Sequence, residues 1–245
     1  MAELVDALVS GTSGPRPWKF ESSPGHHDPR SPPRRHGVRE AGPMVHVHER
    51  DLPDGLDLGR EVAIDTEAMG LVPQRDRLCL VQLSAGDGEA HLVRIAQGQT
   101  DAPNLTRMLA DAQTLKLFHY GRFDIAVMAH RFGVLARPVW CTKIASKLVR
   151  TYTDRHGLKN LCQELLGVDL SKQQQSSDWG ADALTDAQAA YAASDVLYLH
   201  ALKAELSGRL AREGRTALAQ ACFDFLPDRA ALDLAGWPDV DIFSH

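Results

Sequence analysis

The chain has 245 residues, of which 44% are hydrophobic and 24% charged, and this composition can support the packed core of one large or two small domains. No stretch approaches the roughly 18 consecutive apolar residues of a membrane-spanning helix, so we expect a soluble protein without membrane contact. The net charge of −5 does not exclude nucleic-acid binding, because a local stripe of Lys and Arg can bind phosphates on an acidic chain.

Residues 1–43 are rich in Pro, Gly, Ser, Arg and His, and we expect them to be a disordered leader. Six Lys or Arg residues stand against five acids here, which makes a weak nucleic-acid-binding arm. The opening stretch, residues 2–13, looks like the peptide produced when a transfer-RNA gene is translated by mistake. We therefore interpret Met44 as the true start and 44–245 as a single domain with a C-terminal helix and tail.

Alternation of apolar and polar residues begins after Met44 and predicts a first strand at 45–49. His46 and His48 share a face of this strand and could hold a metal, but no third ligand is near in sequence, which favours a solvated face. Further strands are predicted at Val62–Ile64, Leu78–Leu83 and His91–Ile95. The last two are separated by a hairpin signal at Gly86–Gly88, and the short turns predict an antiparallel meander.

Two carboxylates stand one residue apart where the strand at Val62–Ile64 ends. Asp65 and Glu67 project from the same face of an extended chain, so they repel each other. A divalent cation between them would remove that cost. An isolated Asp-x-Glu is also compatible with solvated acids in a polar turn, so the metal interpretation depends on further carboxylates.

Helices and strands alternate in the next part of the chain. A helix is predicted from about Asp101 to Leu109, and a strand at Leu115–His119 is followed by a helix that Gly133 stops. Asp124 falls where that strand gives way to the helix, a common position for site residues. Downstream we predict a strand at Val139–Cys141, a helix at Lys143–Val149 and a helix from about Leu158 that ends at Gly167.

A capping box of Thr185 and Gln188 starts the helix that carries Tyr191 and Asp195, which lie four apart on one face. Apolar residues extend this helix to about Leu210. A last helix is predicted at about 212–225, with a less regular segment from Pro227 onward.

In order and local context, these acids and the tyrosine resemble the three motifs of the four-carboxylate (DEDD) 3′→5′ exonuclease superfamily, in its tyrosine-bearing branch. The histidine-bearing branch would place His at position 190, which is Ala here. The segment His156–Leu161, followed by Gly167, Leu170, Lys172 and 175–179, further resembles the ribonuclease D family. The resemblance covers about residues 61–205 and implies an α/β, RNase H-like fold, with a mixed five-stranded sheet of meander plus parallel strands, flanked by helices.

The resemblance also implies two-metal-ion chemistry with Mg²⁺ or Mn²⁺. Asp65, Glu67 and Asp195 would hold the metal that binds the nucleophilic water. Asp65 would bridge to a second metal supported by Asp124. Tyr191 would orient the attacking water, because a phenol with a pKa near 10 is a poor general base at pH 7.

Candidate substrate-binding residues fall into two groups. Apolar side chains that could wedge against terminal bases, or equally pack in the core, are Met69, Leu71 and Phe123. Polar residues between the second and third motifs that could contact phosphates, or lie on a solvated helix face, are Lys143, Lys147, Arg150, Arg155, Lys159, Lys172 and Gln175. One departure from many relatives is Tyr120, which stands where they have Asn.

We expect an exoribonuclease that trims the 3′ ends of structured RNA, transfer-RNA precursors among them, and releases nucleoside 5′-monophosphates. A DNA exonuclease is the alternative, because contacts to the 2′-hydroxyl cannot be placed from sequence. A non-catalytic nucleic-acid-binding scaffold is disfavoured by the intact acid set. The four scattered cysteines favour a reducing, cytoplasmic compartment. The oligomeric state stays open.

Overall fold

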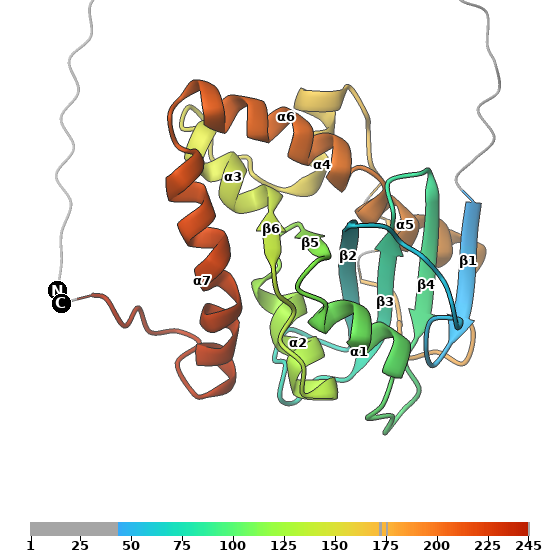
Figure 1. Cartoon of the computed structure of the whole chain (residues 1–245). Helices are drawn as coiled ribbons and strands as arrows, with labels where there is room; N and C mark the ends of the chain where they lie inside the picture. The colour runs from blue at the N-terminus through green and yellow to red at the C-terminus, as the bar shows by residue number, and fades with distance from the viewer. Residues whose placement is uncertain (1–43, 172, 175, 245) are drawn as a thin grey trace, which may run out of the picture. The chain divides into compact units, whose positions relative to one another are not determined.

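The computed structural model describes residues 44–171, 173–174 and 176–244. Their centre is a six-stranded sheet in the order β1-β4-β3-β2-β5-β6 (Figure 1). The strands are β1 (Met44–Glu49), β2 (Glu61–Ala68), β3 (Leu78–Ser84), β4 (Glu89–Arg94), β5 (Leu115–Phe118) and β6 (Val139–Cys141). β2, β3 and β4 form the antiparallel meander predicted from the sequence, and β5 and β6 extend it in parallel.

The mixed α/β architecture is confirmed, but the sheet has six strands and not five. The sixth strand is β1, which was predicted as a strand at 45–49 but not as part of the sheet, and it pairs in parallel with β4 at the edge of the meander. Main-chain hydrogen bonding to a free sheet edge explains its place there, because β4 would otherwise expose a row of unpaired amide and carbonyl groups. The leader at 1–43 lies outside the described residues.

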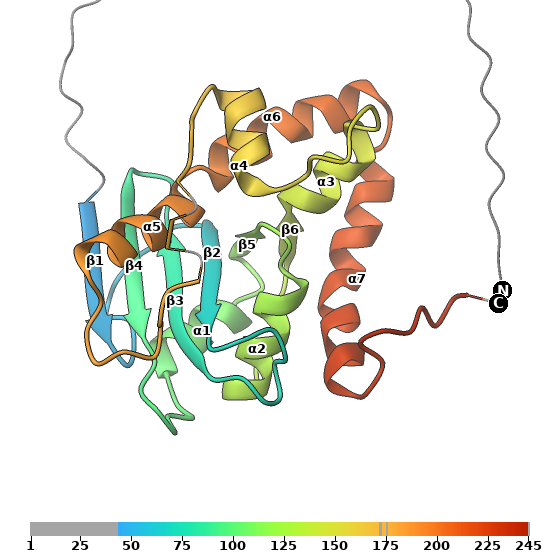
Figure 2. The same ribbon diagram turned by 180° about the vertical axis from the view of Figure 1, so that it is seen from behind.

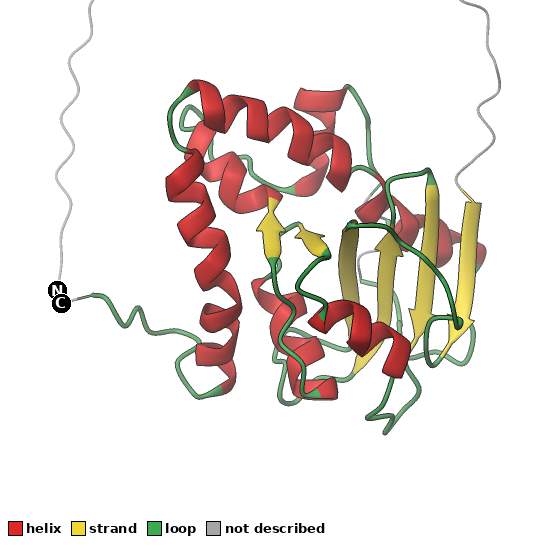
Figure 3. Ribbon diagram, viewed as in Figure 1, coloured by secondary structure: helices red, strands yellow, loops and turns green. Residues whose placement is uncertain are grey.

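Helices cover both faces of the sheet (Figures 2 and 3). α5 (Asp186–Leu197) packs on β2, β3 and β4, whereas Leu105 and Leu109 of α1 (Pro103–Ala110) join the main hydrophobic core. A second group of helices packs beside β5 and β6 and consists of α2 (Arg122–Phe132), α3 (Thr142–Val149), α6 (Leu199–Arg212) and α7 (Thr216–Leu234). Between α3 and α5 the chain forms α4 (Leu158–Leu161) and the π-helical turn η1 (Cys162–Leu166).

Several helix ends follow from local chemistry. Gly133 and Gly167 adopt φ of 71° at the ends of α2 and η1, a conformation that glycine reaches without strain. The capping box at α5 is present as predicted, with the Gln188 amide N–H donating to the Thr185 hydroxyl. This cap fixes the register of the helix that carries Tyr191 and Asp195.

Two helix predictions were wrong. The helix from Thr185 does not run on to Leu210, because Tyr198 separates α5 from α6 with φ −104° and ψ −2°. The last helix runs from Thr216 to Leu234 and includes Pro227, where irregular chain was expected. Pro227 is buried, and packing of α7 against α2 and β6 outweighs the hydrogen bond lost at the proline.

None of the described helices is long and apolar enough to cross a membrane.

Candidate active site

β2 presents the first two acids. Asp65 and Glu67 alternate with buried Ile64 and Thr66, so the carboxyl groups leave the same face of the strand. The pairing of β2 with β3 shifts register between Glu67 and Ala68, and such bulges often re-aim side chains beside sites. The acids therefore lie where the regular sheet ends.

The third acid, Asp124, lies in the first turn of α2 and is buried. The Thr66 hydroxyl donates to its carboxylate Oδ1 at 2.6 Å, which ties α2 to β2. Gly121 precedes α2, and a Cβ there would lie 2.5 Å from the Cβ of Phe118. Glycine thus permits the tight turn that brings Asp124 to the sheet.

α5 brings the remaining two residues. Asp195 joins Asp65 and Glu67 with carboxylate oxygens that all lie within 4.8 Å of one another. Within the described residues this trio is the only group of three or more His, Cys, Asp or Glu side chains with that geometry. Tyr191 lies one turn before Asp195, and its ring packs 6.1 Å from the buried Trp179 ring.

Burial raises the pKa of every acid in this cluster, and repulsion by neighbouring acids adds to the rise at Asp65, Glu67 and Asp195. The pKa of Glu67 rises to about 8 because the side chain is desolvated and lies near Asp195 and Asp124. Burial likewise raises the pKa of Asp124 and of Asp195 to about 7, and that of Asp65 well above its usual value. Hard oxygen ligands that repel one another are the donor set that suits divalent cations such as Mg²⁺ or Mn²⁺.

Burial and the nearby acids also raise the pKa of Tyr191. Its phenol therefore stays protonated at neutral pH and can donate a hydrogen bond. It is a poor proton acceptor under the same conditions, in keeping with the orienting role expected from sequence.

The acids open into a cleft of about 980 Å³. The three predicted apolar contacts all line it: Met69 and Leu71 from the loop after β2, which are 52% and 84% exposed, and Phe123 from α2. Such exposure of large apolar side chains beside the acids favours substrate contact over a core role for Met69 and Leu71.

The basic residues predicted to contact phosphates, which we call the predicted basic track, do not all lie beside the cleft. Lys143 lies near it, with its ammonium 3.8 Å from the centre of the Tyr120 ring, and Tyr120 is a lining residue. Three other predicted basic residues are not among those that line the cleft: Lys147, Arg155 and Lys159, the last of which faces Asp169 at 3.8 Å. Lys172 and Gln175 lie outside the described residues.

Arg150 departs from the predicted role in phosphate binding. Its side chain is fully buried, and its guanidinium donates to Glu164, to the Ser146 hydroxyl and to the carbonyl of Arg155. The sequence placed it in a basic run but gave no sign of this inward network. We therefore leave Arg150 out of the proposed substrate contacts.

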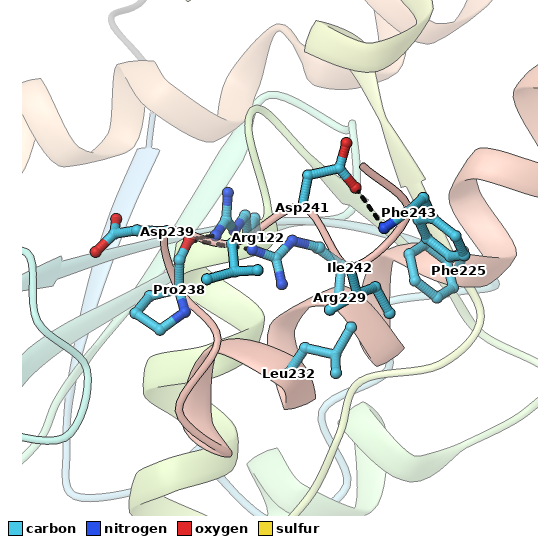
Figure 4. A pocket seen from close by; sticks show the side chains of 10 residues that line it. Arg122, Phe225, Arg229, Leu232, Pro238, Asp239, Asp241, Ile242 and Phe243 are labelled. Carbon is cyan, nitrogen blue, oxygen red and sulfur yellow. Dashed lines mark hydrogen bonds between the residues drawn. The ribbon is translucent and has the colours of Figure 1, made fainter. Parts of the chain in front are cut away.

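The end of α7 and the segment after it line the cleft, and the sequence analysis did not predict this. Arg122 donates two hydrogen bonds to the buried Asp233 carboxylate, at 2.6 and 2.7 Å, and one to the carbonyl of Pro238 at 2.5 Å. Arg229 also pairs with Asp233, at 3.1 Å. Figure 4 shows both arginines beside the segment that contains Pro238 and Asp239, and Asp233, Pro238 and Asp239 line the cleft. We call the bonded group of Arg122, Arg229, Asp233 and the Pro238 carbonyl the α2–α7 clasp.

His46 and His48 acquire neighbours that the sequence left open. The centre of the His91 ring lies 4.9 Å from that of His46 and 5.3 Å from that of His48, and His46 bonds to Glu89. His48 Nε2 and His91 Nδ1 lie 3.0 Å apart and share a hydrogen bond. Among the described residues, these histidines do not form a ligand group like that of the acids.

A protein-family model described as a 3′-5′ exonuclease matches residues 50–211, which include all four acids and Tyr191. The chain belongs to this 3′-5′ exonuclease family. The family match ends before α7, so the α2–α7 clasp joins the matched domain to a helix beyond it.

The relatives differ in how much of their own length this chain covers. Ribonuclease D of Gluconacetobacter diazotrophicus is 38% identical over 176 residues, which are 71% of this chain and 44% of that protein. The crystal structure of Escherichia coli RNase D, an exoribonuclease involved in structured RNA processing, matches at 30% identity and a TM-score of 0.63. That match covers 70% of this chain and 45% of RNase D. The chain thus spans less than half the length of these ribonuclease D relatives.

NrnC of Brucella melitensis matches over nearly its whole length. Its structure with bound Mg²⁺ is 58% identical, with a TM-score of 0.80, and the match covers 82% of this chain and 99% of NrnC. NrnC has also been solved bound to pGG, at 59% identity and a TM-score of 0.81. The resemblance to ribonuclease D and the RNase H-like exonuclease fold are confirmed by these relationships.

Proposed function

We propose that the chain is a divalent-metal-dependent 3′→5′ exoribonuclease that shortens single-stranded RNA and releases nucleoside 5′-monophosphates. The observation that carries this proposal is the convergence of Asp65, Glu67 and Asp195 within 4.8 Å, inside a cleft, in a member of the 3′-5′ exonuclease family. Asp124 lies close enough to repel Asp65 and to raise its pKa.

The four carboxylates would hold two divalent cations, Mg²⁺ or Mn²⁺, which when bound supply an activated water and charge stabilisation at the scissile phosphate. The fit rests on the donor chemistry, since every acid of the cluster has a raised pKa in the absence of a counter-charge. The Mg²⁺-bound structure of NrnC, at 58% identity, supports the choice of metal.

The remaining side chains would position the substrate. Tyr191 donates a hydrogen bond to the attacking water and orients it toward the phosphate. Met69, Leu71 and Phe123 contact the terminal bases from the cleft wall. Among the basic residues predicted to contact phosphates, Lys143 contacts Tyr120, which lines the cleft.

The substrate we propose is a single-stranded RNA 3′ end. The ribonuclease D relationship supports trimming of structured RNA, and we include transfer-RNA precursors in that class of substrate. NrnC bound to pGG favours very short oligonucleotides as substrates as well, because pGG denotes a 5′-phosphorylated dinucleotide and NrnC is the more similar protein. The four free cysteines are consistent with the cytoplasmic compartment that such RNA substrates require.

The experiment uses the 245-residue protein, its Asp65→Asn variant and, as a matched control, Asp182→Asn, which changes an exposed acid on the loop before α5. Each protein is incubated with 5′-labelled RNA, the matching DNA and pGG, with Mg²⁺, Mn²⁺ or EDTA. We expect a metal-dependent ladder that shortens RNA from its 3′ end in the wild type and in Asp182→Asn. Loss of one metal-binding carboxylate should lower the rate by at least about 100-fold.

The outcomes separate the alternatives. A ladder mainly on DNA would replace RNA as the substrate. No ladder on any substrate, together with no metal-dependent rise in melting temperature, would leave a nucleic-acid-binding scaffold as the better account.

A further inference from the structure

Tyr120 has an unusual backbone for an aromatic residue. Its φ is 64°, and among described non-glycine residues only Arg50, with φ 71°, shares the left-handed region. A Cβ-bearing, bulky side chain is disfavoured there, whereas Gly and Asn are tolerated. Strained residues of this kind persist where the surrounding structure holds them, and they concentrate at binding sites.

The surrounding structure fixes Tyr120 from both sides. His119 bonds through Nδ1 to the Thr142 hydroxyl at 2.8 Å, and Gly121 packs against Phe118. The chain must turn between β5 and α2 so that Asp124, in the first turn of α2, reaches the acid cluster. The turn requires the left-handed conformation but not a tyrosine, so the ring itself needs an explanation.

The Tyr120 ring is placed to meet a substrate. It is 50% exposed and lines the same cleft as the four acids. The Lys143 ammonium lies 3.8 Å from the ring centre, and Lys143 is not a lining residue of the cleft. The cation therefore covers one face of the ring and holds its orientation, so a base that stacks on Tyr120 must use the opposite face.

We propose that Tyr120 is a stacking platform for a nucleobase of the bound oligonucleotide, held in place by Lys143. This inference rests on the proposed function, because it assigns a substrate contact to the same cleft. Bases of any sequence can stack on an aromatic face, so the contact supplies affinity without sequence preference. Lys143 also adds positive charge beside an otherwise acidic cleft, where the substrate phosphates must enter.

The test compares Tyr120→Asn, which removes the ring and suits the backbone, with Tyr120→Phe, which keeps the ring. Arg50→Asn is the matched control, because it makes the same change at the other left-handed position, remote from the cleft lining. Steady-state kinetics are measured with Mg²⁺ on short RNA. Stacking is measured separately by quenching of a 2-aminopurine-containing oligonucleotide in Ca²⁺.

We expect Tyr120→Asn to raise KM about 5- to 100-fold with kcat changed by less than about threefold, the range expected for one lost base stack. Quenching should be lost in Tyr120→Asn and retained in Tyr120→Phe and Arg50→Asn. A melting temperature at or above that of the wild type will show that Tyr120→Asn is folded.

The proposal is overturned if Tyr120→Asn keeps both its KM, within about twofold, and its quenching. It is also overturned if kcat falls with KM unchanged, since Tyr120 would then shape the acid cluster. Failure of the wild type to cleave RNA would instead refute the proposed function, and the quenching measurement would still report on Tyr120.

Discussion

Asp65, Glu67 and Asp195 crowd three carboxyl groups into a partly buried space, and this makes the metal-free protein sensitive to pH. Each folded-state pKa lies above its ordinary value, with Glu67 at about 8 and Asp195 at about 7. The folded protein therefore binds these protons more tightly than the unfolded chain does. The stability contributed by the protonated cluster is present below pH 4 and is lost as pH rises through 7 to 8.

In EDTA we expect the melting temperature to fall between pH 5.5 and 8.5, and Glu67→Gln to reduce the fall. Mg²⁺ should oppose it at the alkaline end, because metal replaces the proton as counter-charge and binds the folded state. Asp182→Asn should follow the wild-type curve. A melting temperature that is the same across this range in wild type and Glu67→Gln would contradict the raised pKa values.

Individual polar residues were also the hardest to place from sequence. Lys116 lies within β5 and is fully buried, with its ammonium bonded to the carbonyls of Asp111 and Arg137 at 2.6 and 2.5 Å. Arg150 is buried by a comparable set of partners. Both side chains point into the protein because carbonyl and carboxylate groups, brought together only in the folded chain, accept their hydrogen bonds. A local pattern of charge in the sequence could not reveal this.

At the scale of elements, the α2–α7 clasp connects the start of α2, which carries Asp124, to a helix outside the matched family domain. Arg122 and Asp233 are 111 residues apart in sequence, and no periodicity predicts their pairing. The site motifs, in contrast, were recognisable because each is local: a strand alternation at Asp65 and Glu67, and a capping box that sets the register of α5.

We expect Asp233→Asn to lower the free energy of unfolding by about 2 kcal/mol, because it removes a charge-assisted bidentate hydrogen bond from a largely buried position. The variant should also lower kcat/KM by about tenfold, because α2 would be held less firmly and Asp124 would be positioned less precisely. Urea unfolding and RNA cleavage measure the two effects.

Asp228→Asn is the matched control on the same helix. Asp228 pairs with Arg137, and both side chains are about half exposed, at 53% and 45%. Loss of this pair should lower the free energy of unfolding by less than about 1 kcal/mol and leave RNA cleavage unchanged. Equal losses in the two variants would show that the clasp has no special role.

For the whole molecule, β1 connects the start of the described chain to the sheet. We propose that residues 44–245 form one domain, and β1 begins at Met44 and pairs with β4 along its whole length. A protein that starts at Met44 should then match the full chain in kcat/KM and melt within about 2 °C of it.

A protein that starts at Asp51 lacks β1 and exposes the edge of β4. It should melt at least about 5 °C lower and associate at high concentration, because an uncovered edge can pair with another chain. Thermal unfolding and light scattering would detect both changes. An unchanged melting temperature for this shorter protein would show that β1 is dispensable.

The place of Pro238 and Asp239 in the cleft wall has a practical consequence for handling the protein. An affinity tag fused after Asp239 follows a segment that borders the cleft, so the tag can compete with the proposed RNA substrate for entry. A tag fused ahead of β1 leads into the opposite edge of the sheet from β6, three strands away from β2. Kinetic constants for this chain are therefore best taken from amino-terminally tagged or untagged protein.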